Sequence, residues 1–438
     1  MTEQPQIPYA DQLTKLIDGM LRGVEEANGL TSIHVGAPAT LAEQITAKVE
    51  KLAPELVALS HDIHANPELG YEEHYTVATI ARLLAAHGHD TEVGAYGVPT
   101  ALRAKAGRGR PTVAVIAEYD ALPDIGHACG HNVIAATAVG AFLALAEVIG
   151  DLDGSVELIG TPAEEGGGGK ELIALAGGFD AIDAALMVHP FGADAAEHPW
   201  LGVRQVEAVF HGAAAHASAM PFFGRNALDA AVTAYQSLAQ LRQHMLPTDR
   251  IHGIITDGGQ KPNIVPERAA MLWYLRSAEP ATLRVLSDRA REIFEGAALA
   301  TGTNLELNWD PTPVYLPVRN NHALAARYAA NLAPRGRKVL PLGVLPGEIS
   351  GSTDMGNVSV RVPSIHPLLA TAPPYVTIHT APFAEHAVME QADRSCVDGA
   401  IGLALTAADF LTDSTLRADA GEQFKAAGGV IDPADLLA

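Results

Sequence analysis

The chain has 438 residues, of which 48% are hydrophobic, and this length favours two domains over one core. Lysine and arginine number 29 against 51 aspartate and glutamate residues, which gives a formal net charge of −22 at pH 7. A charge of this sign argues against nucleic acid or an anionic membrane surface as a partner, because both attract positively charged proteins.

The N-terminal run MTEQPQIPYADQLTKLIDGM carries acids and prolines where a secretion signal has a basic start and an apolar segment. The most apolar stretch, residues 133–146, is short for a membrane span. We therefore expect a cytoplasmic protein. The first 50 residues have a helical, partly exposed pattern, and residues 40–87 are expected to form amphipathic helices interrupted by the loop HANPELGYEE.

Short apolar runs then alternate with helical patterns. Strands are expected at residues 112–117 (TVAVIA), 155–160 (SVELIG) and 184–188 (AALMV), with helices at 133–149 and 168–177. Strands that alternate with helices predict an α/β domain with a mostly parallel sheet and helices on its faces.

The pattern changes near Val203. Strands are expected at residues 203–210, 250–256, 269–276 and 304–309, and helices at 226–245 and 280–301. The resulting order, β-α-β-β-α-β, is that of a ferredoxin-like domain. Strands and helices of the first kind resume after about residue 318. We therefore expect a discontinuous main domain, residues 1–202 and 318–438, interrupted by a smaller inserted domain, residues 203–317.

Polar side chains follow each expected strand of the main domain. Glu118-Tyr119-Asp120 and GHACGHN come after the first strand, TPAEEGGGG after the second, and His189 after the third. The carboxyl ends of parallel strands meet at one edge of a sheet, where ligands bind. A thiol, imidazoles and paired carboxylates would therefore gather there, and a protein does not bury such a group without a counter-charge. Two divalent cations would supply it.

The residue types suit zinc-like metals, which bind thiolate, imidazole and carboxylate. Cys129 and His131 stand two residues apart in a loop flanked by glycines, and such a loop can turn both side chains toward one point. The adjacent Glu164 and Glu165 point in different directions. One of them can hold metal while the other faces the substrate as a base.

Two other interpretations of these residues stay open. Cys129 could be a nucleophile paired with a histidine, although both glutamates and His189 would then have no role. The chain could also be a non-catalytic protein that binds a small acid or peptide, and the presence of a base beside a metal ligand argues against this. Two cysteines do not make a disulfide framework, so Cys396, in a helical run, is expected to be a small core residue.

Four runs stand in a familiar order: AEYDALPDIGHACGHN, GTPAEEGGGGK, HGAAAHASAMPFFGRNALDA and GGQKPNIVPERA. They resemble the M20 family of metallopeptidases and amidohydrolases. The match is to the branch of aminoacylases, indole-acetyl-amino-acid hydrolases and p-aminobenzoyl-glutamate hydrolases, and it extends from about His61 to about His386. The resemblance implies a catalytic domain with two metal ions and a smaller lid domain that also forms a dimer.

The resemblance also assigns roles within the main domain. The implied metal ligands are Cys129, His131, Glu165, His189 and His379, the last in YVTIHTAPF. Glu164 would be the general base that activates the metal-bound water and then passes the proton to the leaving amine.

Five further roles follow for the inserted domain and the last part of the chain. His216, in AAAHASAMP, resembles the lid histidine that stabilises the tetrahedral oxyanion, in related enzymes at the partner subunit's site. Asn263 and Arg276 resemble lid positions that touch the substrate, and Arg276 could equally be a structural ion-pair partner. Ser352 and Asp354 lie in a glycine-rich loop before the last ligand, where Asp354 would bind substrate or cap a helix.

One departure from the family pattern concerns the first strand end. Many members carry His-x-Asp there, whereas this chain has Glu118-Tyr119-Asp120, so that histidine ligand is absent. The loop with Cys129 and His131 is the feature of the branch that would replace it. Asp120 is then expected to orient a metal ligand.

The implied function is hydrolysis of the amide bond in a small N-acyl or aminoacyl amino acid, as in aminoacylases, dipeptidases and amidohydrolases. Two divalent ions per chain are expected, zinc first, with manganese and cobalt as alternatives. A free carboxylate on the substrate and a homodimer formed through the lid domain are also expected. Hydrolysis of another carbon–nitrogen bond, in an aromatic or xenobiotic amide, is the alternative.

Overall fold

The computed structural model describes residues 10–347 and 350–434, and the chain divides into two compact units. The first unit contains residues up to 198, then 319–347 and 358–430. The second contains residues 199–318, 350–357 and those from 431. The inserted domain predicted for residues 203–317 lies within this second unit. The glycine-rich loop at 350–357, which the sequence pattern assigns to the main domain, also clusters with the second unit.

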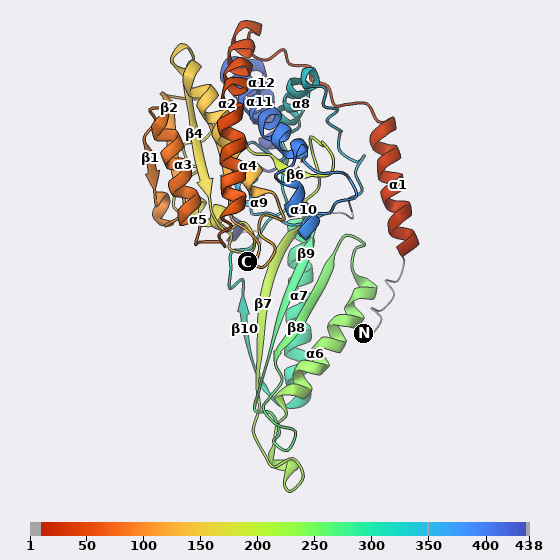
Figure 1. Ribbon diagram of the computed structural model, residues 1–438. Coiled ribbons are helices and arrows are strands. Elements are labelled where there is room, and N and C mark those ends of the chain that lie inside the picture. Colours follow the sequence, from red (N-terminus) through yellow and green to blue (C-terminus); the bar gives the residue numbers. More distant parts are fainter. Residues whose placement is uncertain (1–9, 348–349, 435–438) are drawn as a thin grey trace. The chain divides into compact units, whose positions relative to one another are not determined.

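A six-stranded sheet lies at the centre of the first unit (Figure 1). In spatial order its strands are β1 (Thr91–Val93), β2 (Leu102–Arg108), β4 (Gly154–Thr161), β3 (Thr112–Glu118), β5 (Ala184–Leu186) and β11 (Ser364–Ile365). The strands from β4 to β11 pair in parallel, as predicted. β1 and β2 pair antiparallel at one side and were missed by the sequence pattern, so the sheet is mixed.

A separate two-stranded sheet continues from the end of the parallel strands. It pairs β6 (His189–Phe191) in parallel with β12 (Leu368–Ala370). His189, expected at the end of a strand over residues 184–188, is therefore the first residue of the next strand.

Helices make up much of the rest of the first unit. They are α1 (Ala10–Glu26), α2 (Ala39–Ala65), α3 (His74–Ala86), α4 (His131–Val148), α5 (Gly169–Leu175), α8 (His322–Leu332), α10 (Ala381–His386), α11 (Glu390–Thr412) and α12 (Ser414–Ala426). α2, α4 and α11 pack against one another, and α4 and α11 also contact β3 (Figure 1). α4 and α11 are long and apolar enough for a membrane span, but 89% of each apolar window is buried, as in core helices of a folded domain.

Helix α4 begins earlier than the pattern predicted. Its first residue is His131, so this side chain projects from a helix end and not from the middle of a loop. Gly130 immediately before it has a φ of 79°, in the left-handed region. A Cβ atom at Gly130 would also lie 2.8 Å from the Cβ atom of Pro190. Glycine is therefore needed here to let the chain turn from Cys129 into the helix.

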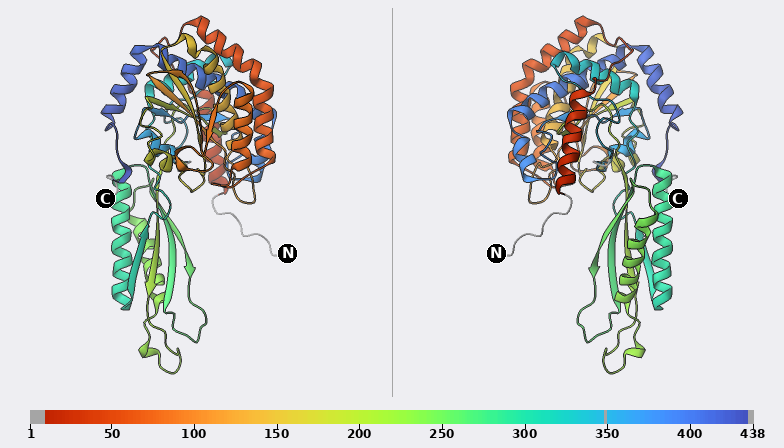
Figure 2. Two further views of the ribbon diagram at one scale, coloured as in Figure 1. Left: turned by 90° about the vertical axis from the view of Figure 1, so that its left-hand side faces the viewer. Right: turned by 90° about the vertical axis from the view of Figure 1, so that its right-hand side faces the viewer.

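The second unit has the predicted β-α-β-β-α-β order (Figure 2). Its elements are β7 (Gly202–His211), α6 (Ala227–Leu241), β8 (Arg250–Asp257), β9 (Arg268–Ser277), α7 (Pro280–Thr301) and β10 (Asn304–Trp309). The strands form an antiparallel sheet in the order β10-β7-β9-β8. Its core joins both helices to alternate residues of β7 and β9, including Phe210 and Trp273. The short helix α9 (Met355–Ser359) begins within the segment at 350–357.

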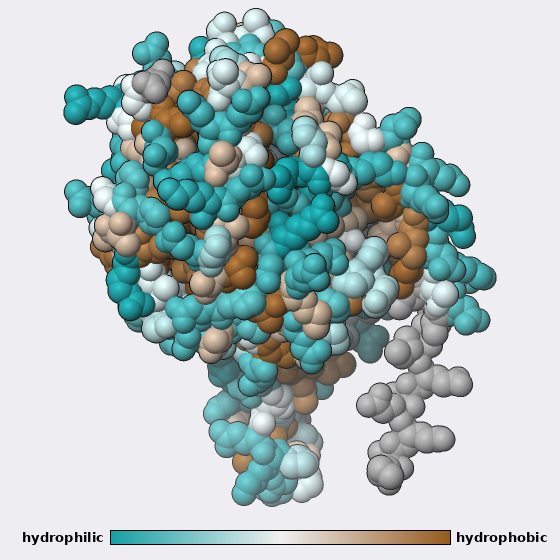
Figure 3. All heavy atoms as spheres, turned by 45° about the horizontal axis from the view of Figure 1, so that its top comes forward, coloured by the Kyte–Doolittle hydropathy of each residue, from teal (hydrophilic) through white to brown (hydrophobic). Residues whose placement is uncertain are grey.

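The face drawn in Figure 3 is dominated by hydrophilic residues, with apolar residues in scattered groups. Exposed apolar side chains that stand singly are normal on folded proteins. In the second unit, the exposed large hydrophobic residues include Ile254 on β8 and Val232 on α6.

Candidate metal centre

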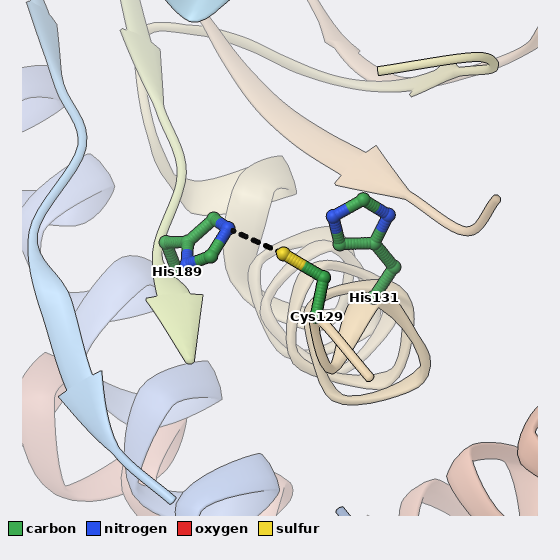
Figure 4. A group of neighbouring side chains, drawn as sticks. All are labelled: Cys129, His131 and His189. Atoms are coloured by element: carbon green, nitrogen blue, oxygen red, sulfur yellow. Dashed lines mark hydrogen bonds between the residues drawn. The ribbon is translucent and has the colours of Figure 1, made fainter. Parts of the chain in front are cut away.

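Cys129 lies between two imidazoles at the edge of the parallel strands of the first unit (Figure 4). Its Sγ atom is 3.4 Å from Nε2 of His189, the first residue of β6. His131, at the start of α4, faces the thiol from the other side, and its ring centroid is 6.0 Å from that of His189. All three side chains are buried. The structure thus places two distant motifs around one sulfur atom.

Both imidazoles are oriented by hydrogen bonds from the ring nitrogen that faces away from the thiol. Nδ1 of His131 lies 2.9 Å from the carbonyl oxygen of Asp120 and 3.1 Å from its Oδ1 atom. Nδ1 of His189 lies 2.8 Å from the carbonyl oxygen of Pro190. Since these oxygens only accept hydrogen bonds, each Nδ1 atom is the donor, and in the neutral ring that a metal ion requires each Nε2 atom keeps a lone pair. This is the arrangement found in metal-ligating histidines.

Asp120 connects the two ligand-bearing loops. Besides His131, its carboxylate accepts a hydrogen bond from the backbone amide of Glu165 at 2.9 Å. Burial acts to raise the pKa of Asp120, but His131 and these hydrogen bonds hold it below its ordinary value. Asp120 is therefore a buried carboxylate that fixes both a histidine and the turn that carries the glutamates, which is the placement expected of an orienting residue.

Glu165 and His379 form the second part of the cluster. Oε1 of Glu165 lies 3.2 Å from Nε2 of His379, which follows β12 and precedes α10. The backbone amide of His379 donates to the carbonyl of Ala128 at 2.8 Å, so the C-terminal segment is attached beside Cys129. Glu164, the expected base, is buried next to Glu165.

The side chains of this cluster fit divalent metal ions. Three overlapping groups each have ligand atoms within 4.8 Å of one another. They are Cys129, His131 and His189; Cys129, Glu165 and His379; and His131, Glu164 and Glu165. Nε2 of His131 and Oε1 of Glu165 are buried without a hydrogen bond, which is costly unless a cation binds them. Because Cys129 belongs to two of the groups, its sulfur is placed to be shared by two ions.

The electrostatics of Cys129 oppose the interpretation that it is a nucleophile. Burial raises the pKa of its thiol, and the Glu165 carboxylate raises it further. Reactive cysteines have lowered pKa values, because the thiolate is the attacking species. Burial and nearby His131 lower the pKa of His189 to about 3, so this ring is neutral and suited to metal binding. A cation would also stabilise the thiolate.

An ion pair beside the cluster was not predicted from the sequence. Lys170, at the start of α5, binds Oε1 of Glu118, and both side chains are fully buried. The other oxygen of Glu118 lies 3.6 Å from Nε2 of His131. Glu118 thus occupies the strand end where many family members carry a histidine, with its charge balanced by Lys170. A glutamate that ends a wholly apolar strand was the available signal, since it requires a buried partner.

Two expected residues of the second unit lie together on an exposed loop pair. Ala217 donates its backbone amide to the carbonyl of Asn263 at 3.0 Å, and His216 forms a bridge with Ile264. Nδ1 of His216 accepts from the backbone amides of Ser218 and Ala219, at 3.4 and 3.2 Å. In a neutral ring the proton then lies on Nε2, which is left to donate to another group.

Arg276 and Ser352, also in the second unit, are brought together. Nη1 of Arg276, on β9, donates to the hydroxyl of Ser352 at 2.7 Å. Burial lowers the pKa of Arg276, and among the described residues no carboxylate pairs with it. The ion pair of the alternative interpretation is therefore not seen among the described residues, and both interpretations of Arg276 stay predictions. Asp354 is buried before α9, and its carbonyl accepts from the amide of Asn357 at 3.0 Å.

Comparisons with known proteins agree with the motifs and the geometry. Residues 114–382 match the model of peptidase family M20/M25/M40. The Xaa-Arg dipeptidase of Mus musculus is 38% identical over 392 residues, which cover 86% of this chain and 90% of that protein. One of the subunits of the p-aminobenzoyl-glutamate hydrolase of Escherichia coli (strain K12) is 34% identical over 283 residues, which cover 60% of this chain and 59% of that protein.

A solved structure shows the same fold. It is that of a dinuclear metal binding peptidase from the M20 family of Bacillus subtilis, with a TM-score of 0.64 and 20% identity. The likeness covers 83% of this chain and 99% of that one. The family resemblance predicted from the four sequence motifs is thus confirmed, and so is the α/β fold.

Proposed function

The chain belongs to peptidase family M20/M25/M40, and on this premise we propose that it hydrolyses the amide bond of a small N-acyl or aminoacyl amino acid. The observation that carries the proposal is the sharing of Cys129 between two groups of metal-ligating side chains, with Glu164 beside them. A ligand shared between two ions would hold them close together, as in dinuclear hydrolases. A protein that only binds its ligand has no use for a carboxylate base beside it.

The proposed roles divide the cluster into ligands, a base and an orienting group. His131 and His189 would hold one ion and Glu165 and His379 the other, with Cys129 common to both. Such ions, zinc first and manganese or cobalt as alternatives, lower the pKa of the attacking water and polarise the carbonyl. Glu164 takes the proton from the water and gives it to the leaving amine. His216 would donate from Nε2 to the oxyanion, for which its fixed tautomer is suited.

Arg276 supports a substrate with a free carboxylate. Within residues 10–347 and 350–434 no carboxylate pairs with this buried guanidinium, which can make two parallel hydrogen bonds to the carboxylate of a substrate. The Xaa-Arg dipeptidase of Mus musculus is similar over most of both chains. Dipeptides that end in arginine are therefore the first substrates to test.

The activity test compares small amides that differ in the acyl group, the amino acid or the presence of a free carboxylate. The panel contains Xaa-Arg dipeptides, the same dipeptides with an amidated C-terminus, p-aminobenzoyl-glutamate and N-acetyl amino acids. We expect turnover of at least one free acid, loss of turnover with a chelator and its return on adding zinc, manganese or cobalt. Turnover that resists chelation but is abolished by thiol alkylation would instead support the cysteine nucleophile. Binding without turnover would support the non-catalytic alternative.

We also propose that the protein forms a homodimer through the second unit and acts in the cytoplasm. β8 is the last strand of its sheet, and Ile254 on this strand is 61% exposed. An exposed apolar edge strand is a ready surface for pairing with another chain. Ile254→Lys should convert the dimer into a monomer, which light scattering would measure.

The proposed location in the cytoplasm has separate support. Two buried free cysteines agree with a reducing compartment.

A further inference from the structure

The loop between α2 and α3 contacts both loops that carry the metal-ligating side chains. Residues 67–73 (PELGYEE), here called the brace segment, contain most of the loop that interrupts the first helical pattern of the sequence. The carbonyl of Glu68 accepts from the amide of Ala121 at 2.8 Å, next to Asp120. The same segment also contacts the turn that precedes Glu164. It therefore lies against two of the strand ends from which the cluster is built.

The turn before Glu164 has an unusual backbone. Ala163 has a φ of 57°, in the left-handed region that residues other than glycine avoid. Such a conformation costs free energy and persists only where its surroundings impose it. Ala163 is also followed directly by the expected base and the ligand Glu165, so its conformation sets where both side chains begin.

Glu73 and two neighbours surround Ala163. Oε1 of Glu73 accepts a hydrogen bond from the Ala163 amide at 2.9 Å, and the Glu73 side chain is fully buried. A Cβ atom on Gly70 would lie 2.8 Å from the Cβ atom of Ala163, so only glycine fits there. The hydroxyl of Tyr71 donates to the carbonyl of Gly167 at 2.6 Å, and the amide of Gly167 donates to the carbonyl of Ala163. The brace segment thus holds the turn from both of its ends.

We propose that Glu73 is a positioning residue for the amide hydrolysis, which holds the left-handed turn at Ala163 and thereby aims Glu164 at the reacting bond. The inference rests on the proposed function. A displacement of about 1 Å at a catalytic group can cost a hundredfold in rate, so a buried acceptor on the turn that carries the base has a large effect. Glu165 has a second attachment, through its amide to Asp120, and so keeps its place.

The environment of Glu73 explains why a carboxyl group is kept there. Burial raises the pKa of Glu73 to about 7, while the Thr100 hydroxyl acts to lower it and the Asp120 carboxylate to raise it. An ionisable group costs stability in such a place, and an apolar residue would pack without that cost. The Ala163 amide would then be a buried donor without an acceptor. The hydrogen bond to the Ala163 amide therefore explains why a carboxyl group occupies this buried position.

The test compares Glu73→Ala and Glu73→Gln with Glu72→Ala, a matched change at the exposed neighbour. In Glu73→Ala we expect kcat to fall about 10- to 100-fold, with KM within about twofold and the metal content unchanged. In Glu73→Gln the amide oxygen still accepts from Ala163, so kcat should return to within about threefold of the wild type. Glu72→Ala should match the wild type.

Two results would overturn the proposal. One is a Glu73→Ala protein that is folded and has the kcat of Glu72→Ala. The other is an equal loss in Glu73→Ala and Glu73→Gln, which would mean that the hydrogen bond to Ala163 is not what matters. If Glu73→Ala fails to fold, Tyr71→Phe releases the other end of the turn at a half-buried position. It should lower kcat about fivefold, and a wild-type kcat there would equally overturn the proposal.

Amide hydrogen exchange separates this proposal from the proposed function, because it needs no substrate. In a peptide spanning residues 161–168, exchange should be about tenfold faster in Glu73→Ala than in the wild type and unchanged in Glu72→Ala. Unchanged exchange in Glu73→Ala would contradict the positioning role. If the wild type cleaves no substrate of the panel but exchange is still faster in Glu73→Ala, the proposed function is contradicted. The role of Glu73 in holding the turn at Ala163 would still be supported.

Discussion

The expected functional residues of the two units are held in different ways. In the first unit, Cys129, His131 and His189 are buried, the first two at or just before the start of α4 and the third at the start of β6. In the second unit, His216 and Asn263 are exposed on loops and are held mainly by local backbone contacts. A buried cluster with unsatisfied polar atoms needs a partner for its own stability, whereas exposed side chains need none. From this comparison we expect Cys129, His131 and His189 to bind metal in the first unit, and His216 and Asn263 to act on the substrate.

The largest effect should separate the two adjacent glutamates of the first unit. Glu164→Gln should lower kcat about 10³-fold and keep both metal ions, because it removes the base but no ligand. Glu165→Gln, the matched change next to it, should lose metal as well as activity. We would measure kcat and metal content for both. Full activity in Glu164→Gln would exclude it as the base.

His216→Ala tests whether the second unit acts on the reaction without holding metal. We expect kcat to fall about 10²-fold, the cost of removing one oxyanion donor, with unchanged metal content. His211→Ala, an exposed histidine on β7 paired with Glu306, is the control and should behave as the wild type. A loss of metal in His216→Ala would contradict the claim that His216 acts on the reaction without binding metal.

Asp120→Asn tests the orienting role within the first unit. Asparagine has only one side-chain oxygen, so it can accept from His131 or from the Glu165 amide but not from both, and it carries no charge. We expect metal affinity to fall about 10- to 100-fold, measured by competition with a chelator. Asp124→Asn, at an exposed neighbour in the same loop, is the control. Equal affinities of the two variants would show that Asp120 does not support the ligands.

Arg276→Ala should have a smaller effect that is confined to substrate binding. We expect KM for a free-acid dipeptide to rise about tenfold, while the amidated dipeptide is unaffected, because only the carboxylate contact is lost. Arg268→Ala, which removes an exposed arginine paired with Asp257, should change neither constant. An equal change for both substrates would argue against carboxylate recognition.

The strand ends could be predicted from the sequence because buried parallel strands are short apolar runs with polar residues directly after them. This rule alone is enough to bring Cys129, Glu165 and His189 to one edge of the sheet. It missed β1 and β2 because β1 has three residues and LRAKAGR in β2 mixes charged and apolar residues. Antiparallel strands beside a parallel sheet do not need a continuous apolar pattern.

Buried charged residues that support the site were harder to predict from the sequence than the metal ligands. Glu73 and Lys170 are charged residues whose burial depends on contacts with distant segments, and no local pattern reports such contacts. The start of α4 at His131 was also missed, because the left-handed Gly130 places a helix end where the glycines suggested a loop. His379 could be assigned only from the family motif.

The metal content of Cys129→Ala tests the central claim most directly. The matched control is Cys396→Ala, which removes the other buried thiol, on α11. Elemental analysis of protein purified without chelators or added metal should give about two transition-metal ions per chain in the wild type and in the control. In Cys129→Ala the value should fall well below that of the control. Equal metal content in both variants, or a wild type that binds no metal when zinc, manganese or cobalt is supplied, would contradict the shared-cysteine centre.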